Sequence, residues 1–217
     1  MSLLLLVRHG QASWGAADYD NLSELGGEQS RLLGAHLAAL GVQPSRAWVG
    51  GMKRHQQTAE AAIEAAGWSV TTEVDEGWAE FDHVAILEVH GDAPDAHGMP
   101  ITDFNALFDA AIRRWTGGEH AAEYAEPFEA FTGRVEAAVQ RAADELGQGE
   151  TGVVFTSGGP IAWAAARLLG GGVEQWGRLN PVQVNTGVSR LVSGSRGVTL
   201  VSVNEQAHLG PDTLTYR

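Results

Sequence analysis

The hydrophobic pattern of the chain begins with an apolar run that passes directly into charged residues. Leu3 to Val7 are all apolar and show no period, which is typical of a strand buried on both faces of a sheet. Arg8, His9 and Gly10 follow at the carboxyl end of this predicted strand. Because ligands bind at that edge in open α/β sheets, we expect the chemistry of the chain to be organised around these three residues.

Helical and extended patterns alternate over the next part of the chain. Leucines between residues 32 and 40 form a helical stripe, and the predicted helix has Ser23 as its N-cap and ends at Gly41. The same reasoning predicts a strand over residues 46–49, a helix over 54–66 and a strand over 69–74.

The periodicity weakens between residues 83 and 126, where glycines and prolines interrupt the pattern. One helix, near residues 103–115, is expected there. We interpret this stretch as a cap-like excursion over the active-site edge, inserted into a single domain that spans residues 1–217.

Regular patterns return after the excursion. They predict a helix over residues 128–146, a strand over 152–156, a helix that starts at Pro160 and ends at Gly170, and a hairpin of 188–192 with 198–203. Strands that alternate with helices favour an α/β fold. We expect a three-layer α/β/α sandwich with a mostly parallel central sheet.

Composition narrows the class of protein. The 217 residues are 44% hydrophobic, which is enough for a sizeable core, and carry a net charge of −13. That sign argues against general binding to nucleic acid or to acidic membranes. The chain has no cysteine, no apolar run long enough for a membrane helix and no pattern of a signal peptide. A cytoplasmic protein is therefore expected.

Three stretches at predicted strand ends carry candidate chemistry. They are Arg8-His9-Gly10, residues 51–60 (Gly-Met-Lys-Arg-His-Gln-Gln-Thr-Ala-Glu) and Ser157-Gly158-Gly159. These stretches resemble the motifs of the histidine phosphatase superfamily, also called phosphoglycerate mutase-like. The resemblance implies that His9 is transiently phosphorylated and that Arg8 and Arg54 bind phosphate. Ser157 and Gly158 are expected to bind phosphate as well. Two planar guanidinium groups suit a phosphomonoester dianion, and a neutral histidine can attack phosphorus.

A general acid should protonate the leaving oxygen. In the family this is a glutamate after the third strand, and Glu80 is the best match, with Asp82 second. Gln11 and Ser23, in and near the entry to the first helix, are secondary candidates for the site.

The sequence departs from the family pattern in two places. Gly50-Gly51 stands where a serine-proline pair is usual, and Ser157 stands where the family has a histidine that donates to the phosphoryl oxygens. A serine hydroxyl can donate but carries no charge, so we expect a rate loss of roughly 10- to 100-fold. We name His83, three residues after Glu80, as a candidate that compensates for the loss.

The other histidines rank lower. His36 is expected to be on a helix surface or in the core, His55 only to pack, and His90, His97 and His120 to lie in the excursion. None of the histidines has metal-ligand spacing, so we expect no metal and no cofactor.

The leading hypothesis is a phosphohydrolase of a small phosphomonoester that acts through a phosphohistidine on His9. A phosphoglycerate-type mutase is one alternative, and a weakly active or non-catalytic phospho-ligand-binding module, motivated by Ser157, is another. A serine hydrolase built on Ser157 is disfavoured because the G-x-S-x-G pattern fails at Phe155. The expected partner is a small phosphorylated substrate; substrate identity and a homodimer are left open.

Overall fold

A computed structural model describes residues 1–13, 20–91 and 100–216. The chain forms two compact units. The first contains Met1–Glu80 and Val135–Arg217, and the second is Phe81–Arg134. None of the helices in the described residues is both long enough and apolar enough to span a membrane.

A six-stranded sheet forms the centre of the first unit, with the order β3-β2-β4-β1-β5-β6. The strands are β1 (Ser2–Arg8), β2 (Arg46–Val49), β3 (Thr72–Val74), β4 (Thr151–Thr156), β5 (Val188–Gly194) and β6 (Gly197–Glu205). The pairs β1–β4, β2–β4 and β2–β3 are parallel, whereas β5 is antiparallel to both of its neighbours. The predicted α/β class with a mostly parallel sheet is therefore confirmed.

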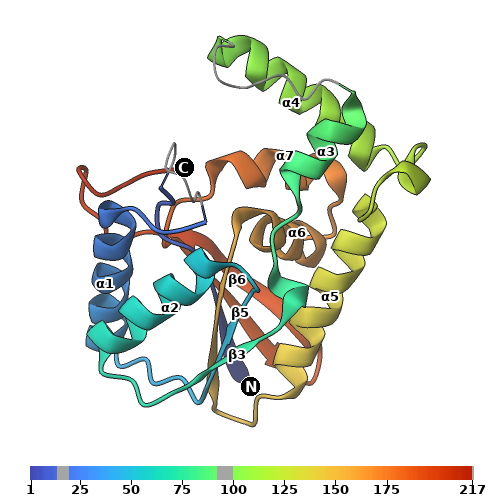
Figure 1. Ribbon diagram of the computed structural model, residues 1–217. Coiled ribbons are helices and arrows are strands. Elements are labelled where there is room, and N and C mark those ends of the chain that lie inside the picture. Colours follow the sequence, from blue (N-terminus) through green and yellow to red (C-terminus); the bar gives the residue numbers. More distant parts are fainter. Residues whose placement is uncertain (14–19, 92–99, 217) are drawn as a thin grey trace. The chain divides into compact units, whose positions relative to one another are not determined.

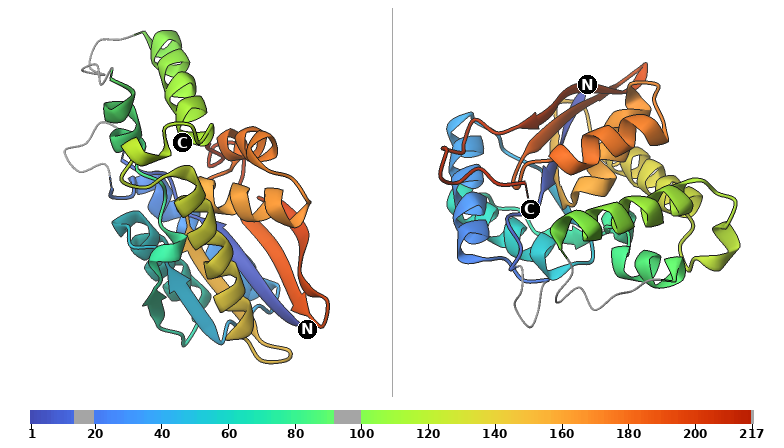
Figure 2. Two further views of the ribbon diagram at one scale, coloured as in Figure 1. Left: turned by 90° about the vertical axis from the view of Figure 1, so that its right-hand side faces the viewer. Right: turned by 90° about the horizontal axis from the view of Figure 1, so that it is seen from above.

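Helices flank the sheet on both faces (Figures 1 and 2). The helices α1 (Glu24–Ala39) and α2 (Lys53–Ala66) lie side by side on one face. On the other face lie α6 (Gly158–Leu168) and the part of α5 (Phe128–Asp144) that belongs to this unit, and α7 (Val173–Leu179) follows α6.

The alternation of side chains along β1 serves both faces of the sheet. Leu5 and Val7 belong to the core cluster that includes Leu33 and Leu37 of α1. Leu4 and Leu6, which alternate with them, are also almost completely buried. The uninterrupted apolar run thus follows from a strand that is covered on both sides.

An aromatic cluster organises the second unit, which contains α3 (His83–His90), α4 (Ile101–Thr116) and the start of α5. The Trp115 ring lies 5.2 Å from Phe81, 4.9 Å from Phe128 and 5.6 Å from Phe131, measured between ring centroids. The Trp115 indole N–H donates to the Glu126 carbonyl. These contacts give a weakly periodic stretch a core of its own.

The sequence patterns predicted most of the helices and strands, but not all of their ends. The second strand has the predicted bounds, and the Ser23 hydroxyl caps α1 by accepting from the Gly26 N–H at 3.0 Å. The third strand is shorter than predicted, covering only Thr72–Val74. Pro160 is the third residue of α6, not the first, and α6 ends at Leu168, before Gly170. Helices α3 and α7 were not predicted.

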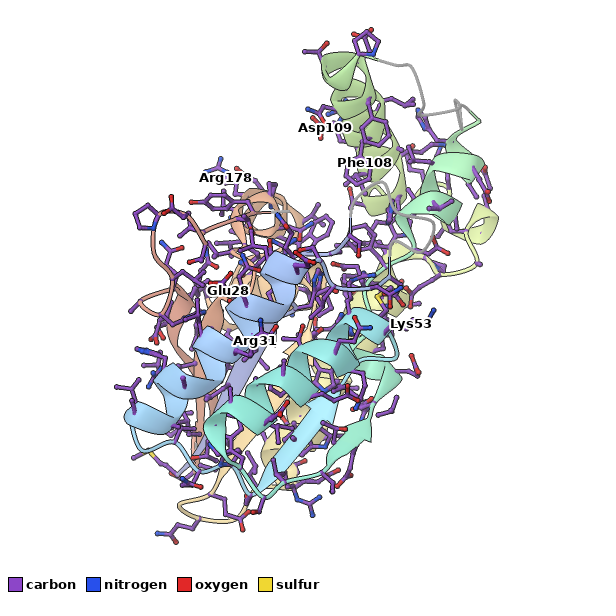
Figure 3. All side chains as sticks on the ribbon, turned by 60° about the vertical axis from the view of Figure 1, so that its left-hand side comes forward. Glu28, Arg31, Lys53, Phe108, Asp109 and Arg178 are labelled. Atoms are coloured by element: carbon purple, nitrogen blue, oxygen red, sulfur yellow. The ribbon has the colours of Figure 1, made fainter. Side chains whose placement is uncertain are left out.

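Two glycines of α1 provide a test of its packing against α2. A Cβ on Gly34 would lie 2.2 Å from the Ala62 carbonyl oxygen, whereas a Cβ on Gly27 would meet only the flexible Arg31 side chain at 3.5 Å. Glu28 and Arg31 mark the exposed side of this helix (Figure 3).

We expect Gly34→Ala to lower the free energy of unfolding by about 1–3 kcal/mol, because the two helix backbones must separate. Gly27→Ala is the matched control and should raise it by about 0.5–1 kcal/mol, since alanine is the better helix former. Urea denaturation monitored by circular dichroism measures both. Equal effects of the two substitutions would contradict the close helix contact.

Candidate active site

The carboxyl edge of the sheet gathers the predicted site residues of the first unit. Arg8 ends β1 and His9 follows it, while Ser157 follows β4, the parallel neighbour of β1. Arg54 lies in the first turn of α2, directly after β2, and Glu80 follows a short 3-10 helix (Glu76–Trp78) after β3. The topology therefore brings residues from four adjacent strands to one edge, as expected for an open α/β sheet.

The His9 imidazole is held in one tautomer by its own neighbour. Nδ1 lies 2.7 Å from the Gly10 carbonyl oxygen. A carbonyl only accepts, so Nδ1 carries the proton and donates it. Nε2 then keeps its lone pair, which is the form required of a nucleophile.

Burial and neighbouring cations keep this imidazole uncharged. Only 5% of His9 is exposed. Burial lowers the pKa of His9 well below its usual value, and the positive charges of Arg8 and Arg54 and the His55 ring lower it further, against the opposing hydrogen bond to Gly10. His9 is therefore neutral at physiological pH.

Close backbone contact explains the glycine that follows His9. A Cβ on Gly10 would lie 2.4 Å from the Gly26 carbonyl oxygen at the start of α1. The Gly10 N–H donates to the Thr58 hydroxyl of α2 at 3.0 Å. Helices α1 and α2 thus fix the turn that orients His9.

The Arg8 guanidinium is anchored by main-chain carbonyls. Its Nη1 donates to the Gln183 carbonyl in the loop before β5, and to the Tyr216 carbonyl at 2.9 Å. The C-terminal segment therefore reaches the strand end where Arg8 lies.

Arg54 is nearly buried and pairs with a carboxylate that the sequence analysis did not single out. Its Nη1 lies 2.7 Å from Asp20 Oδ1. The other Asp20 oxygen accepts from the Lys53 N–H at 2.9 Å, at the first residue of α2. An isolated acid in a polar loop carries no sequence signal for this contact.

Glu80 lies at the amino end of α6. Its Oε2 accepts from the Gly159 N–H at 3.1 Å. Ser157 and Gly158 immediately precede that donor, and both are buried. The predicted acid and the glycine pair after β4 are therefore neighbours in the structure.

Ser157 contacts a histidine for which only packing was expected. Nε2 of His55, on α2, lies 2.7 Å from the Ser157 hydroxyl oxygen, and neither residue is exposed. The centroid of the His55 ring is 5.7 Å from that of His9. Burial and the Arg54 charge lower the pKa of His55 to about 3, partly opposed by the Gly50 backbone.

A buried polar network of hydrogen bonds holds the His9 backbone carbonyl in place. The Asn185 side-chain amide donates to the His9 carbonyl at 3.1 Å, and its oxygen accepts from the Thr215 hydroxyl. Gln29 donates to Thr215 and accepts from the Gln11 N–H at 2.9 Å. Neither Asn185 nor Gln29 is among the site residues predicted from the sequence.

The remaining candidates have other contacts. The Gln11 side chain accepts from the Ser23 hydroxyl at 2.9 Å. Asp82 caps α3 by accepting from the Val84 and Ala85 N–H groups, and it belongs to the second unit, as does His83 at the start of α3. Asp82 therefore has a local structural role. His97 lies outside the described residues.

Sequence comparison agrees with this geometry. The family profile of the histidine phosphatase superfamily (branch 1) matches residues 4–206. The chain belongs to this superfamily. No curated protein matches it significantly.

Solved structures of the superfamily share the fold at low sequence identity. YhfR of Bacillus stearothermophilus is 20% identical with a TM-score of 0.71, and the match covers 96% of this chain and 99% of that one. A phosphoserine phosphatase mutant of Entamoeba histolytica in complex with phosphoserine is 19% identical with a TM-score of 0.68, covering 96% and 100%. A phosphoglycerate mutase of Bacillus anthracis is 20% identical with a TM-score of 0.66, covering 95% and 94%. The superfamily includes phosphatases and mutases alike.

Within the described residues, this histidine phosphatase fold shows no group of three or more acidic or histidine side chains placed to hold a metal ion.

The loop before β5 carries local backbone strain. Thr186 has a φ of 58°, which is unusual for a β-branched residue. Its N–H donates to the Arg8 carbonyl at 3.1 Å, and its hydroxyl lies 2.9 Å from His208 Nε2.

Histidines whose pKa is lowered in the folded protein should make the protein less stable in acid. Burial and His36 lower the pKa of His208 to about 4, whereas its ordinary value in the unfolded chain is 6.5. From pH 6.5 down to about 4 the unfolded chain binds a proton that the folded chain does not, so the free energy of unfolding falls as the pH falls. His55 acts in the same direction, down to about pH 3.

We expect His208→Asn to reduce the slope of stability against pH between pH 6.5 and 4. Urea unfolding of both proteins at several pH values measures it. Above pH 7.5 both should show the same pH dependence, which serves as the internal control. Identical slopes below pH 6.5 would mean that His208 takes up its proton equally well in the folded state.

Proposed function

We propose that this chain is a phosphohydrolase that acts on a small phosphomonoester through a phosphohistidine intermediate on His9. The observation that carries the proposal is the Nδ1–H hydrogen bond from His9 to Gly10, which leaves Nε2 unprotonated close to the charges of Arg8 and Arg54. A neutral nucleophile beside two guanidinium groups suits a phosphoryl dianion.

In the first step His9 Nε2 attacks phosphorus, and the bond from phosphorus to the leaving oxygen breaks. Glu80, protonated, gives its proton to that oxygen. Arg8 and Arg54 hold the other phosphoryl oxygens and stabilise the transition state by charge and position. The products of this step are the free alcohol and phosphohistidine.

In the second step water attacks the phosphorus of the phosphohistidine. The Glu80 carboxylate accepts a proton from that water, and the N–P bond breaks. The electron pair of this bond returns to Nε2, so inorganic phosphate leaves and the starting tautomer is restored.

The named ligands of similar structures support a small phosphorylated substrate. Two structures of an Entamoeba histolytica phosphoserine phosphatase hold phosphoserine and 3-phosphoglyceric acid. A mutase would share the first step and return the phosphoryl group to a second hydroxyl. Hydrolysis is proposed as the outcome because it requires no second substrate site.

Substitution of His9 tests the proposed nucleophile. The His9→Ala variant should lose turnover of p-nitrophenyl phosphate by at least about a thousandfold, because the substitution removes the proposed phosphoryl acceptor. In the wild-type protein, rapid quenching at neutral or alkaline pH followed by mass spectrometry should find phosphate on His9. The control is His36→Asn, a half-buried histidine of α1, which should keep wild-type turnover.

The same experiment separates the alternatives. Labelling of His9 with inorganic phosphate as the only product supports the phosphohydrolase, whereas phosphate transfer to added glycerate supports a mutase. Tight sulfate binding that needs Arg8 and Arg54, without labelling, would instead favour a non-catalytic module.

Substitution of Glu80 tests the proposed general acid. The Glu80→Gln variant should lower kcat/KM for an alkyl phosphate by about 10²–10⁴-fold, because the poor leaving group needs its proton. For p-nitrophenyl phosphate the loss in kcat/KM should be at least tenfold smaller, since nitrophenolate leaves without protonation. Asp82→Asn is the matched control, and it should leave both ratios close to wild type because Asp82 caps α3. Equal losses on both substrates for Glu80→Gln would contradict the assignment of the acid.

A further inference from the structure

Both departures from the family pattern contact the same side chain. Ser157 Oγ lies 2.7 Å from His55 Nε2. On the other side of the ring, a Cβ on Gly50 would lie 2.5 Å from His55 Nδ1. The glycine and the serine are therefore the small residues that make room for a fully buried imidazole.

We propose, on the basis of the proposed function, that His55 and Ser157 together replace the histidine that the family has after its fourth strand. His55 is a positioning residue that acts through Ser157, and the Ser157 hydroxyl is the group that donates to the phosphoryl oxygen. His83 has no part in this assignment. The 5.7 Å between the His55 and His9 ring centroids places the second imidazole beside the nucleophile, although it comes from α2 and not from the loop after β4.

The direction of the hydrogen bond follows from the two ring nitrogens of His55. The Gly50 backbone lies near enough to Nδ1 to raise the pKa of His55, but the contact does not have the geometry of a hydrogen bond. A buried N–H without an acceptor is rarer in proteins than an acceptor without a donor. We therefore assign the proton to Nε2, which in this proposal donates it to Ser157 Oγ.

This direction matters for Ser157. A hydroxyl has one hydrogen to donate and two lone pairs that accept. With one lone pair occupied by His55, the hydroxyl hydrogen remains available for the phosphoryl group. Because neither side chain is exposed, water does not compete for the hydrogen bond between them.

His55 and Ser157 differ in charge from the protonated histidine that they are proposed to replace. The His55 imidazole is neutral at physiological pH, since burial and Arg54 lower its pKa to about 3. The two residues thus supply a neutral, preorganised donor where a protonated histidine would supply a charge-assisted one.

Kinetics of single and double variants test the coupling. We expect Ser157→Ala and His55→Phe each to lower kcat for p-nitrophenyl phosphate at least about tenfold with KM changed less than about twofold, because the donor acts mainly in the transition state. If His55 acts through Ser157, the double variant should be no slower than Ser157→Ala alone. His36→Asn is again the control, with wild-type kcat.

Exchange of the two side chains tests the position of the imidazole. Ser157→His alone adds a second imidazole to a space that is already filled, so it should lower both the Tm and kcat. The variant that combines His55→Ser with Ser157→His restores the family arrangement. It should recover the Tm and raise kcat above that of either single variant.

Each outcome decides the proposal. Folded His55→Phe with kcat within twofold of wild type, or losses that multiply in the double variant, overturn it. If His55→Phe does not fold, the exchange variant decides: a folded but inactive protein overturns the proposal, and recovered kcat supports it. If the wild-type protein neither hydrolyses p-nitrophenyl phosphate nor carries phosphate on His9, the proposed function and this inference are both overturned. If the wild-type protein is active and phosphorylated on His9, but His55→Phe has the same kcat, this inference alone is overturned.

Discussion

An uncharged imidazole, buried close to the positive charges of two guanidinium groups, is the constraint on which the rest of the site depends. The His9 ring stays neutral because it is desolvated and because Arg8 and Arg54 oppose a further positive charge. A neutral ring has two tautomers, and the Gly10 carbonyl selects the one that leaves Nε2 unprotonated. That carbonyl is fixed in turn by a backbone contact with Gly26 that leaves no room for a side chain on Gly10. The apolar strand thus ends at an imidazole in a defined protonation state, as the proposed nucleophile requires.

Polar groups far apart in the sequence hold this arrangement in place. Asn185 binds the His9 carbonyl, and Thr215 and Gln29 extend that support to the entry of α1. The Asp20 carboxylate holds the Arg54 guanidinium and also the first N–H of α2. A phosphoryl group that bound Arg54 would therefore meet a guanidinium already oriented by a carboxylate, which lowers the entropic cost of positioning it. The same carboxylate reduces the net positive charge of the site, so the two effects oppose each other.

Sequence patterns located the strands, the capped helix α1 and the strand-end motifs, because each depends on neighbouring residues. The bounds of β2 and the Ser23 cap follow from local chemistry alone. The contact between His55 and Ser157 could not be predicted, since 102 positions separate these residues and a histidine in a helical pattern suggests packing. Asp20 was missed because an isolated acid in a polar loop carries no sequence signal for its contact with Arg54. Helix α3 is short and has no clear helical period, although five of its eight residues are apolar. The aromatic cluster around Trp115 in the second unit joins residues from 81 to 131.

The absence of a motif residue from a sequence is therefore weak evidence that the function of the motif is lost. The family motif specifies a residue at a position, whereas the chemistry requires a hydrogen atom at a place near phosphorus. Helix α2 and the loop after β4 border the same space, so an imidazole can enter from either element, provided that the opposite position becomes small. In this chain Ser157 and Gly50 are the small residues and His55 is the large one. In the proposed arrangement a neutral, hydrogen-bonded donor stands where the family has a charged one. Under the proposed function, the effect expected from Ser157 is therefore a slower phosphoryl transfer to His9, with the proposed nucleophile itself intact.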